Sequence, residues 1–246
     1  MGKFPTPKRT WRGKTRRARA SPTQAHLLLA PGCRNEMLQG SDIWGTNAPS
    51  SYLVAGVDEA GRGCLAGPVV AAAVILRQGV VLPGLTDSKL LSPAVRSRLA
   101  DAIYSAAMSW AVAAVEAEDI DCMDILRATL RAMTEAVYRL VPSPDLVLVD
   151  GTIRPHFSMP ARAIVQGDLR VPAISAASIL AKVTRDRIMG EWAVRFPLYG
   201  FAQHKGYGTL AHRAAILRYG PSPIHRRTFA GVREYAEDPG DQAWLW

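Results

Sequence analysis

Short apolar runs, each followed closely by an acidic residue and a glycine, restrict the fold of this sequence more than any other feature. Runs of this length, bounded by glycine, predict buried strands rather than helices. Strand ends that open on glycine turns place polar side chains at the edge of a sheet, where binding sites form. The runs are residues 52–57, 146–149 and 161–165, and the acids that follow them are Asp58, Glu59, Asp150 and Asp168.

The segments between these runs alternate between strand and helix patterns. Residues 69–76 are predicted to pair with 52–57 in a hairpin, because Gly61, Gly63 and Gly67 mark a turn between them. Residues 110–115 are a further predicted strand, and helices are predicted over 94–108, 121–140 and 175–192. A hairpin followed by alternating helices and strands favours a mixed α/β sheet flanked by helices.

Apolar residues at helical spacing give the predicted helix 121–140 a buried face. The residues expected on that face are Ile125, Leu126, Leu130, Met133 and Val137. A Gly-, His- and Arg-rich region follows the last predicted helix and completes the domain.

Composition divides the chain into three parts. Residues 1–35 contain nine Lys and Arg and no acid, and prolines interrupt any period, so 1–50 is predicted to be a disordered basic extension. An organellar transit peptide is the alternative for this leader, but its Pro and Gly content opposes a long amphipathic helix. Residues 51–235 are predicted to fold as one domain, and 236–246 form a C-terminal tail.

Apolar runs and cysteines exclude a membrane-spanning protein and two kinds of cysteine-based site. The longest apolar run, 65–76, has twelve residues, whereas a spanning helix needs about 20, so no membrane segment is predicted. Cys33, Cys64 and Cys122 are an odd number without a CxxC pair, which excludes a disulfide framework and a zinc knuckle. A reducing, cytoplasmic compartment is therefore expected.

Converging carboxylates indicate a metal site. Any one of these acids alone is more often a turn former or a helix cap. Brought together they repel one another, and a cluster is tolerable only where cations neutralise it. Oxygen ligands favour Mg²⁺ or Mn²⁺ over zinc, and two such ions roughly 4 Å apart can hold the attacking water and the leaving oxygen of a phosphodiester in line.

A series of motifs in fixed order resembles the bacterial ribonuclease HII family, within the type 2 ribonucleases H. The resemblance extends from about Tyr52 to Val232. It rests on Asp58-Glu-Ala-Gly-Arg-Gly63 with Gly67-Pro68, Asp87-Ser-Lys89, Val149-Asp-Gly151, Gly167-Asp168, Ala176-Ala-Ser-Ile179 with Ala181-Lys182 and Arg185-Asp186, His204-Lys-Gly-Tyr-Gly-Thr209, and His225-Arg226.

The resemblance implies a ribonuclease H-like fold with a helical C-terminal region, and a catalytic domain over 51–235. It also implies an endoribonuclease that hydrolyses the RNA strand of RNA–DNA hybrids and cuts 5′ of single ribonucleotides in duplex DNA, leaving a 5′-phosphate. Such an enzyme would serve ribonucleotide removal during DNA replication and repair, as a monomer recruited by a replication factor. The implied catalytic and metal-binding residues, for two Mn²⁺ or Mg²⁺ ions, are Asp58, Glu59, Asp150 and Asp168.

Asp186 is a rival metal ligand in this comparison. Because helical carboxylates usually pair with neighbouring cations, an ion pair with Arg187 or a neighbour is the favoured interpretation.

Substrate recognition is assigned to glycine-rich segments and to cations. Gly61 and Gly63 let the backbone approach a sugar and hydrogen-bond its 2′-hydroxyl, while Arg62 grips the adjacent phosphate. In the family, the tyrosine matching Tyr207 packs on that sugar; considered alone, such a ring is more often a half-buried packing residue. His204 and His225 are expected to order loops rather than to shuttle protons. The expected phosphate contacts are Lys89, Lys182, Lys205 and Arg226.

Two other functions share parts of this pattern. A non-catalytic module that binds RNA–DNA hybrids would keep Lys89 and Tyr207 but would not need all four carboxylates. A transposase or junction resolvase with a ribonuclease H-like fold would have the carboxylates but lack the glycine–arginine–glycine turn and the tyrosine loop. The sequence therefore favours the nuclease.

Deleting residues 1–45 is expected to weaken binding to nucleic acid at low salt while leaving the fold and turnover intact. The nine cationic side chains of this extension would release counterions on contact with phosphates. Affinity for a hybrid duplex, measured across a salt series with the full chain and the truncated one, checks this. Equal salt dependence would show that the extension is not a nucleic-acid arm.

Overall fold

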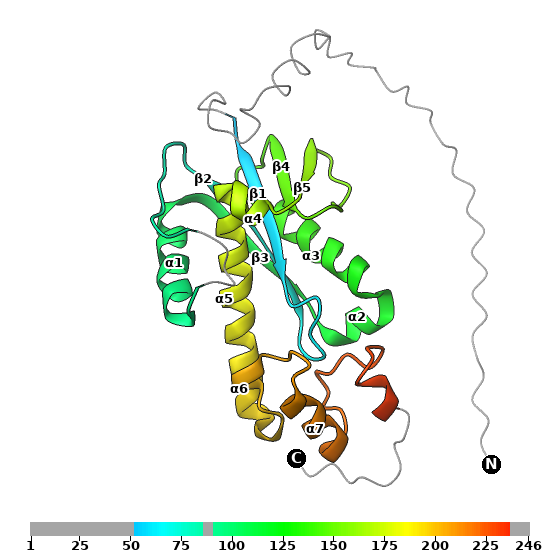
Figure 1. Ribbon diagram of the computed structural model, residues 1–246. Coiled ribbons are helices and arrows are strands. Elements are labelled where there is room, and N and C mark those ends of the chain that lie inside the picture. The colour runs from blue at the N-terminus through cyan, green and yellow to red at the C-terminus, as the bar shows by residue number, and fades with distance from the viewer. Residues whose placement is uncertain (1–51, 86–90, 237–246) are drawn as a thin grey trace, which may run out of the picture. The chain divides into compact units, whose positions relative to one another are not determined.

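The computed structural model describes residues 52–85 and 91–236 (Figure 1). The predicted N-terminal extension, nearly all of the C-terminal tail, and Lys89 in its Asp87-Ser-Lys89 motif lie outside the described residues. Along the described chain, no helix is long and apolar enough to cross a bilayer.

A mixed sheet of five strands forms the centre of the domain, in the order β3-β2-β1-β4-β5. β1 (Val54–Ala60) and β2 (Val69–Leu76) form the predicted hairpin, and β3 (Ala107–Val115) extends it antiparallel to β2. β4 (Leu146–Asp150) pairs parallel to β1, and β5 (Ala161–Ile164) pairs parallel to β4. The mixed α/β sheet predicted from the sequence is confirmed.

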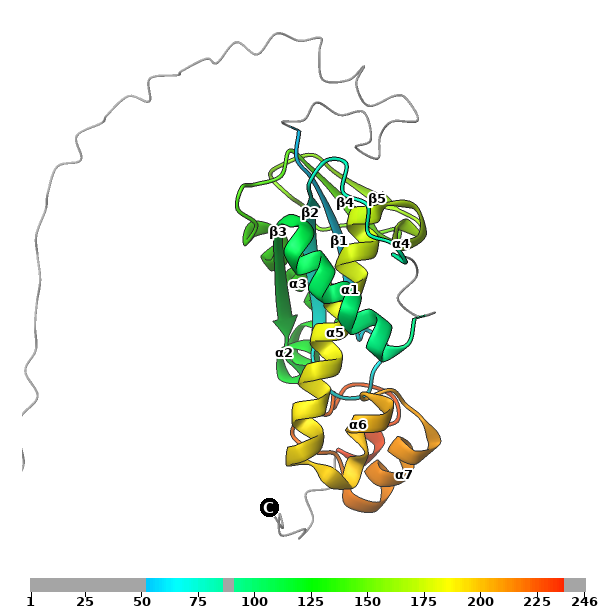
Figure 2. The same ribbon diagram turned by 90° about the vertical axis from the view of Figure 1, so that its left-hand side faces the viewer.

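Helices cover both faces of this sheet (Figures 1 and 2). One face packs against α1 and α5 and the other against α3, while α6 and α7 lie with the C-terminal half of α5, past the sheet. The helices are α1 (Pro93–Ala106), α2 (Ala117–Met123), α3 (Ile125–Tyr138), α4 (Gly167–Arg170), α5 (Pro172–Arg195), α6 (Phe201–His204) and α7 (Leu210–Tyr219), with 3₁₀ turns at Pro197–Tyr199 and Arg233–Tyr235.

Alternation along the strands assigns their side chains to these two faces. In β2, Ala71 and Ala73 belong to the core beneath α3, whereas Ala72 and Val74 belong to the core beneath α1 and α5. On β1, Gly56 lets α5 approach closely, because an added Cβ there would lie 2.1 Å from the carbonyl carbon of Ala173. Small residues thus hold α5 directly against the central strand.

The predicted single helix 121–140 is two helices. Asp124 lies between α2 and α3 with a left-handed φ of 77°, and its side chain caps α3 by accepting a hydrogen bond from Arg127 N at 2.9 Å. The predicted burial of Leu126 is wrong, since 38% of the residue is exposed. Smaller residues, including Ala128 and Ala132, face the sheet instead and allow a closer approach of α3.

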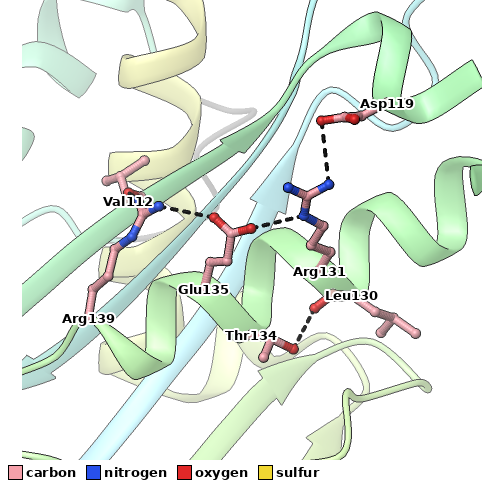
Figure 3. A network of polar contacts seen from close by, with 7 residues as sticks. All are labelled: Val112, Asp119, Leu130, Arg131, Thr134, Glu135 and Arg139. Carbon is pink, nitrogen blue, oxygen red and sulfur yellow. Dashed lines mark hydrogen bonds and ion pairs between the residues drawn. The ribbon is translucent and has the colours of Figure 1, made fainter. Parts of the chain in front are cut away.

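Ion pairs on the surface join α2 to α3, and a hydrogen bond from Arg139 extends this network to β3 (Figure 3). Glu135 receives hydrogen bonds from Arg131 and Arg139, each at 3.0 Å. Arg131 also reaches Asp119 at 3.4 Å, and Arg139 donates to the Val112 carbonyl at 2.8 Å.

Replacing Glu135 with Ala is expected to lower the free energy of unfolding by no more than about 1 kcal/mol, because exposed ion pairs are screened by solvent and alanine favours a helix. About half of each arginine side chain is exposed, 47% for Arg131 and 54% for Arg139. Urea denaturation at low and high salt measures the effect. A loss above about 2 kcal/mol would contradict the exposed-pair estimate.

Candidate active site

The strand pairing brings the first three predicted carboxylates to one edge of the sheet. Asp58 and Glu59 lie inside β1, and Asp150 is the last residue of β4. Because β1 and β4 are parallel and Val57 pairs with Val149, Asp58 and Asp150 extend from the same end of adjacent strands. The sequence placed Asp58 and Glu59 just after a strand that ends at Val57, whereas β1 continues three residues further, to Ala60.

Asp58 is a buried acid surrounded by negative charge. Burial raises its pKa well above the usual value, and the charges of Glu59 and Asp150 raise it further. The Ser178 hydroxyl on α5 and the main-chain N–H of Glu59, 2.7 Å from Asp58 Oδ1, donate hydrogen bonds that oppose the shift. The ionised form of this carboxyl is therefore costly without a cation beside it.

Glu59 has a similar environment with one compensating cation. Burial raises the pKa of its carboxyl, the nearby Asp150 charge adds to the rise, and the Arg62 guanidinium, 3.2 Å from Oε1, opposes it. Oxygen donors with raised pKa values fit a hard divalent cation, whose charge would stabilise both carboxylates.

Asp168 reaches the same region from a helix and not from a strand end. It lies in the first turn of α4, after Gln166 in a left-handed conformation with φ of 53°. The main-chain N–H groups of Gly167 and Asp168 donate to Asp150 Oδ1 at 2.7 and 3.4 Å. The Ser175 hydroxyl donates to the Asp168 carbonyl and ties this turn to α5. The start of α4 thus orients Asp150 and places Asp168 beside it.

Three of the four carboxylates, Asp58, Glu59 and Asp150, lie close enough to influence one another, and the backbone of Asp168 adjoins Asp150. Across residues 52–85 and 91–236, no three His, Cys, Asp or Glu side chains lie together closely enough to form a ready metal site. The pKa shifts show that Asp58, Glu59 and Asp150 interact through their charges, and Asp168 adjoins Asp150 through the backbone.

Asp186 forms an ion pair with a neighbour on its helix, as the sequence favoured, and that neighbour is Lys182 rather than Arg187. Lys182 Nζ lies 2.6 Å from its Oδ1, and Arg96 on α1 lies 3.6 Å from its Oδ2. Arg187, the first predicted partner, pairs instead with Glu191 at 2.7 Å. The Lys182–Asp186 and Arg187–Glu191 pairs both have the i,i+4 spacing that brings side chains together on one helix face.

The turn after β1 has one tightly packed glycine and one open one. Gly61 has a φ of +95°, and an added Cβ would lie 2.0 Å from Arg185 Nε, so a side chain is excluded. At Gly63 an added Cβ would meet nothing within 4 Å, so the backbone there faces open space. Arg62, between them, is half-exposed. A ligand can therefore approach the backbone at Gly63.

The Tyr207 loop lies against this turn. Leu65 N donates to the Gly206 carbonyl at 2.8 Å, and the Cys64 thiol hydrogen-bonds the Tyr207 side chain. Lys182 Nζ and the Arg185 guanidinium lie 5.6 and 5.9 Å from the centre of the Tyr207 ring. The residue remains 44% exposed. The structure thus brings the predicted turn, Lys182 and Tyr207 together.

His204 orders this loop, as expected. Its Nε2 lies 2.6 Å from the Tyr199 carbonyl and therefore donates, while its Nδ1 accepts from Gly206 N at 3.2 Å. Lys205, between them, has a left-handed φ of 52°. This pattern needs a neutral ring, in agreement with burial lowering the pKa of His204.

His225 is fully buried and supports the loop through a second histidine that the sequence reasoning missed. Its Nδ1 accepts from Ser222 N at 2.9 Å, and its Nε2 lies 2.9 Å from His212 Nε2. His212 Nδ1 in turn donates to the Tyr207 carbonyl at 2.9 Å. Burial lowers the pKa of His212 to about 4 and that of His225 to about 3. No local pattern around His212 distinguishes it from an ordinary helical residue.

Arg226 lies inside the protein, which differs from the expectation that it contacts phosphate. The side chain is fully buried and donates to the carbonyls of Gly67, Arg62 and Gly61 at 3.0, 2.8 and 2.7 Å. Its main-chain N also donates to the Leu65 carbonyl at 2.9 Å. Arg226 therefore shapes the Gly61–Gly63 turn from within.

A mixed five-stranded sheet with carboxylates on its central parallel strands, supported by a long helix beneath them, defines a hydrolase of the ribonuclease H-like class. The family model "Ribonuclease HII" matches residues 55–232. The Ribonuclease HII of Coxiella burnetii is 54% identical over 186 residues, which cover 76% of this chain and 92% of that protein.

Solved structures agree with this match. The ribonuclease H2 of Pyrococcus horikoshii superposes with a TM-score of 0.64 at 27% identity, covering 75% of this chain and 97% of that one. The ribonuclease HII of Archaeoglobus fulgidus, solved in a complex with PCNA, superposes with a TM-score of 0.63 at 26% identity, covering 72% and 95%. The chain belongs to the ribonuclease HII family. It is therefore a hydrolase that acts on the RNA of RNA–DNA hybrids, and ribonucleases H depend on divalent metal ions.

Proposed function

We propose that this enzyme also incises duplex DNA on the 5′ side of a single embedded ribonucleotide, using two divalent ions and leaving a 5′-phosphate. The supporting observation is that two of the carboxylates and the glycine-rich turn are adjacent along the chain. β1 carries Asp58 and Glu59 and leads directly into the Gly61–Gly63 turn, and the next residues, Cys64 and Leu65, contact the loop of Tyr207. Carboxylates suited to cations therefore lie next to a surface suited to one sugar.

Asp58, Glu59, Asp150 and Asp168 are the proposed ligands for two Mg²⁺ or Mn²⁺ ions. Such ions activate water and stabilise a departing 3′ oxygen. Burial, together with the charges of Glu59 and Asp150, raises the pKa of Asp58 and supports this assignment, as do the Gly167 and Asp168 amides that fix Asp150. Asp186, held by Lys182 and Arg96, is not among the proposed ligands.

The sugar is proposed to lie between the turn and the Tyr207 ring. The open backbone at Gly63 would hydrogen-bond the 2′-hydroxyl, and Tyr207 would pack on the same ribose. Arg62, Lys182 and Lys205 would contact the flanking phosphates, and Lys89, outside the described residues, is proposed for the same role. A single ribose offers one such hydroxyl, so its recognition requires a local surface of this kind.

Incubation with a duplex DNA that contains one ribonucleotide tests this proposal. With Mg²⁺ or Mn²⁺, we expect one cut at the DNA–RNA junction, with the ribonucleotide at the 5′ end of the downstream fragment. Sequencing gels against an alkaline ladder locate the cut and identify the 5′-phosphate. A protein that cleaves all-RNA hybrids but leaves this substrate intact would contradict the proposal while retaining the family activity.

We also propose that the enzyme acts in the cytoplasm as a monomer, in ribonucleotide removal and DNA repair, and that a replication factor recruits it. The support for recruitment is the Archaeoglobus fulgidus relative, whose structure is a complex with PCNA. Size-exclusion chromatography with light scattering, on the enzyme alone and mixed with the processivity factor of its own replication machinery, tests both statements. If the enzyme alone elutes as a dimer, it is not a monomer. If it does not co-elute with the processivity factor, recruitment by that factor is refuted.

A further inference from the structure

Arg185 is a fully buried cation in the C-terminal half of α5, where that helix continues past the sheet toward α6 and α7 (Figure 2). Its Nε donates to the Pro68 carbonyl and its Nη2 to the Ala66 carbonyl, both at 2.9 Å. Its Nη1 donates to the Lys205 carbonyl, also at 2.9 Å. One guanidinium therefore joins the turn after β1 to the Tyr207 loop.

Glycines let the main chain close around this guanidinium. An added Cβ at Gly61 would lie 2.0 Å from Arg185 Nε, and one at Gly206 would lie 3.3 Å from its Nη2 and 2.5 Å from the Ala66 carbonyl oxygen. Both glycines have a positive φ, +95° and +85°. The turn and the loop are thus shaped to fit Arg185, which lies at their junction.

A buried arginine that hydrogen-bonds only to carbonyls is a costly way to stabilise a fold. Burying a cation carries a large desolvation penalty, and an apolar side chain of similar volume often stabilises as well or better. What a planar guanidinium adds is direction, because its donors have a fixed geometry that fixes the groups they bind. Arg226 holds the carbonyls of Gly61 and Arg62 in the same way. This arrangement suits a need for precise placement rather than for stability alone.

We propose that Arg185 is a positioning residue for ribose recognition, which sets the spacing between the Gly61–Gly63 turn and Tyr207 so that both contact one sugar. The inference rests on the proposed reading of the ribose by these two segments. The guanidinium also lies 5.9 Å from the centre of the Tyr207 ring, so it orients the ring as well as the backbone.

The test compares binding of two duplexes to the wild-type enzyme and to the Arg185→Lys variant. Lysine keeps the charge and much of the volume but lacks the fork of donors. One duplex is DNA with a single ribonucleotide, the other is the identical all-DNA duplex, and Ca²⁺ replaces Mg²⁺, with gels to verify that the strands stay intact. We expect the wild type to bind the ribonucleotide duplex more tightly than the all-DNA duplex. In Arg185→Lys the ratio of these two affinities should fall about tenfold, while the affinity for the all-DNA duplex stays within about threefold of the wild-type value.

A matched control and a local readout separate positioning from general stability. Arg187→Lys changes an exposed arginine on the same helix, paired only with Glu191 among the described ion pairs, and should keep the preference. Hydrogen exchange should increase in Arg185→Lys within peptides spanning 61–68 and 204–209, but not in β4. If Arg185→Lys does not fold, Gly206→Ala displaces the Ala66 carbonyl without removing the guanidinium and should cause the same loss.

The outcomes distinguish this inference from the function on which it rests. A wild-type enzyme without preference for the ribonucleotide duplex overturns the proposed reading of the sugar, and the inference with it. A wild-type preference that survives in Arg185→Lys and in Gly206→Ala overturns the inference alone. A loss of preference that is matched by an equal loss of all-DNA binding also overturns it, because that result describes general damage.

Discussion

Replacing Asp58 with Asn is expected to reduce cleavage of an RNA–DNA hybrid by more than about a hundredfold while changing duplex affinity by less than about tenfold. The carboxylate lies among Glu59 and Asp150, where its charge would hold cations and not substrate. Initial rates at saturating metal, together with binding measured in Ca²⁺, check both parts. Retention of a tenth of wild-type turnover would contradict the assignment.

Stability gives a second readout for the same variant. Because Asp58 is buried beside like charges, Asn should not lower the metal-free melting temperature, but it should diminish the rise in melting temperature that Mg²⁺ or Mn²⁺ produces. Asp101→Asn, on the exposed side of α1, is the matched control and should behave as wild type in each assay. A large loss of metal-free stability would show that Asp58 acts mainly in the fold.

Replacing Tyr207 with Ala is expected to reduce cleavage at a single ribonucleotide by about tenfold or more, with a loss of at most about 2 kcal/mol in the free energy of unfolding. The ring is 44% exposed and lies on a loop between Gly206 and Gly208, so it contributes little to the core. Rates on the single-ribonucleotide duplex and on an all-RNA hybrid, with thermal melts, measure the two effects.

Tyr207→Phe is the control for that experiment. Phenylalanine keeps the ring over which Lys182 and Arg185 lie but loses the hydroxyl that contacts Cys64. We expect Phe to retain most of the junction activity, since packing on the sugar requires the ring. Wild-type junction cleavage by Tyr207→Ala would show that the sugar is read elsewhere.

The sequence predicted the features that depend on local pattern. Residues 69–76 alternate between two buried faces and give β2 at the predicted bounds, and the predicted helix 94–108 starts within one residue of α1. The apolar runs also predicted that Asp58, Glu59 and Asp150 lie at the ends of strands. The break at Asp124 was not predictable, because a left-handed conformation at a residue other than glycine depends on its tertiary surroundings.

Residues whose role depends on distant contacts were assigned incompletely. The sequence assigned Arg226 to phosphate contact and named Arg185 only within a motif, yet the two side chains bind carbonyls 165 and 119 residues away in sequence. His212 gave no signal, because its partners His225 and the Tyr207 carbonyl meet it only in the folded chain. Asp168 was expected directly after a strand, and only the fold shows that a short helix directs its backbone to Asp150.

A single helix, α5, supports both the carboxylates and the Gly61–Gly63 turn that is proposed to contact the sugar. On α5, Ser178 hydrogen-bonds Asp58, and Arg185, seven residues later, joins the turn to the Tyr207 loop. An α-helix rises about 1.5 Å per residue, so these two supports are separated by about 10 Å along an axis that does not stretch. The enzyme would thus measure a constant offset from the ribose to the bond it hydrolyses, and the cut would stay in register whatever the surrounding base sequence.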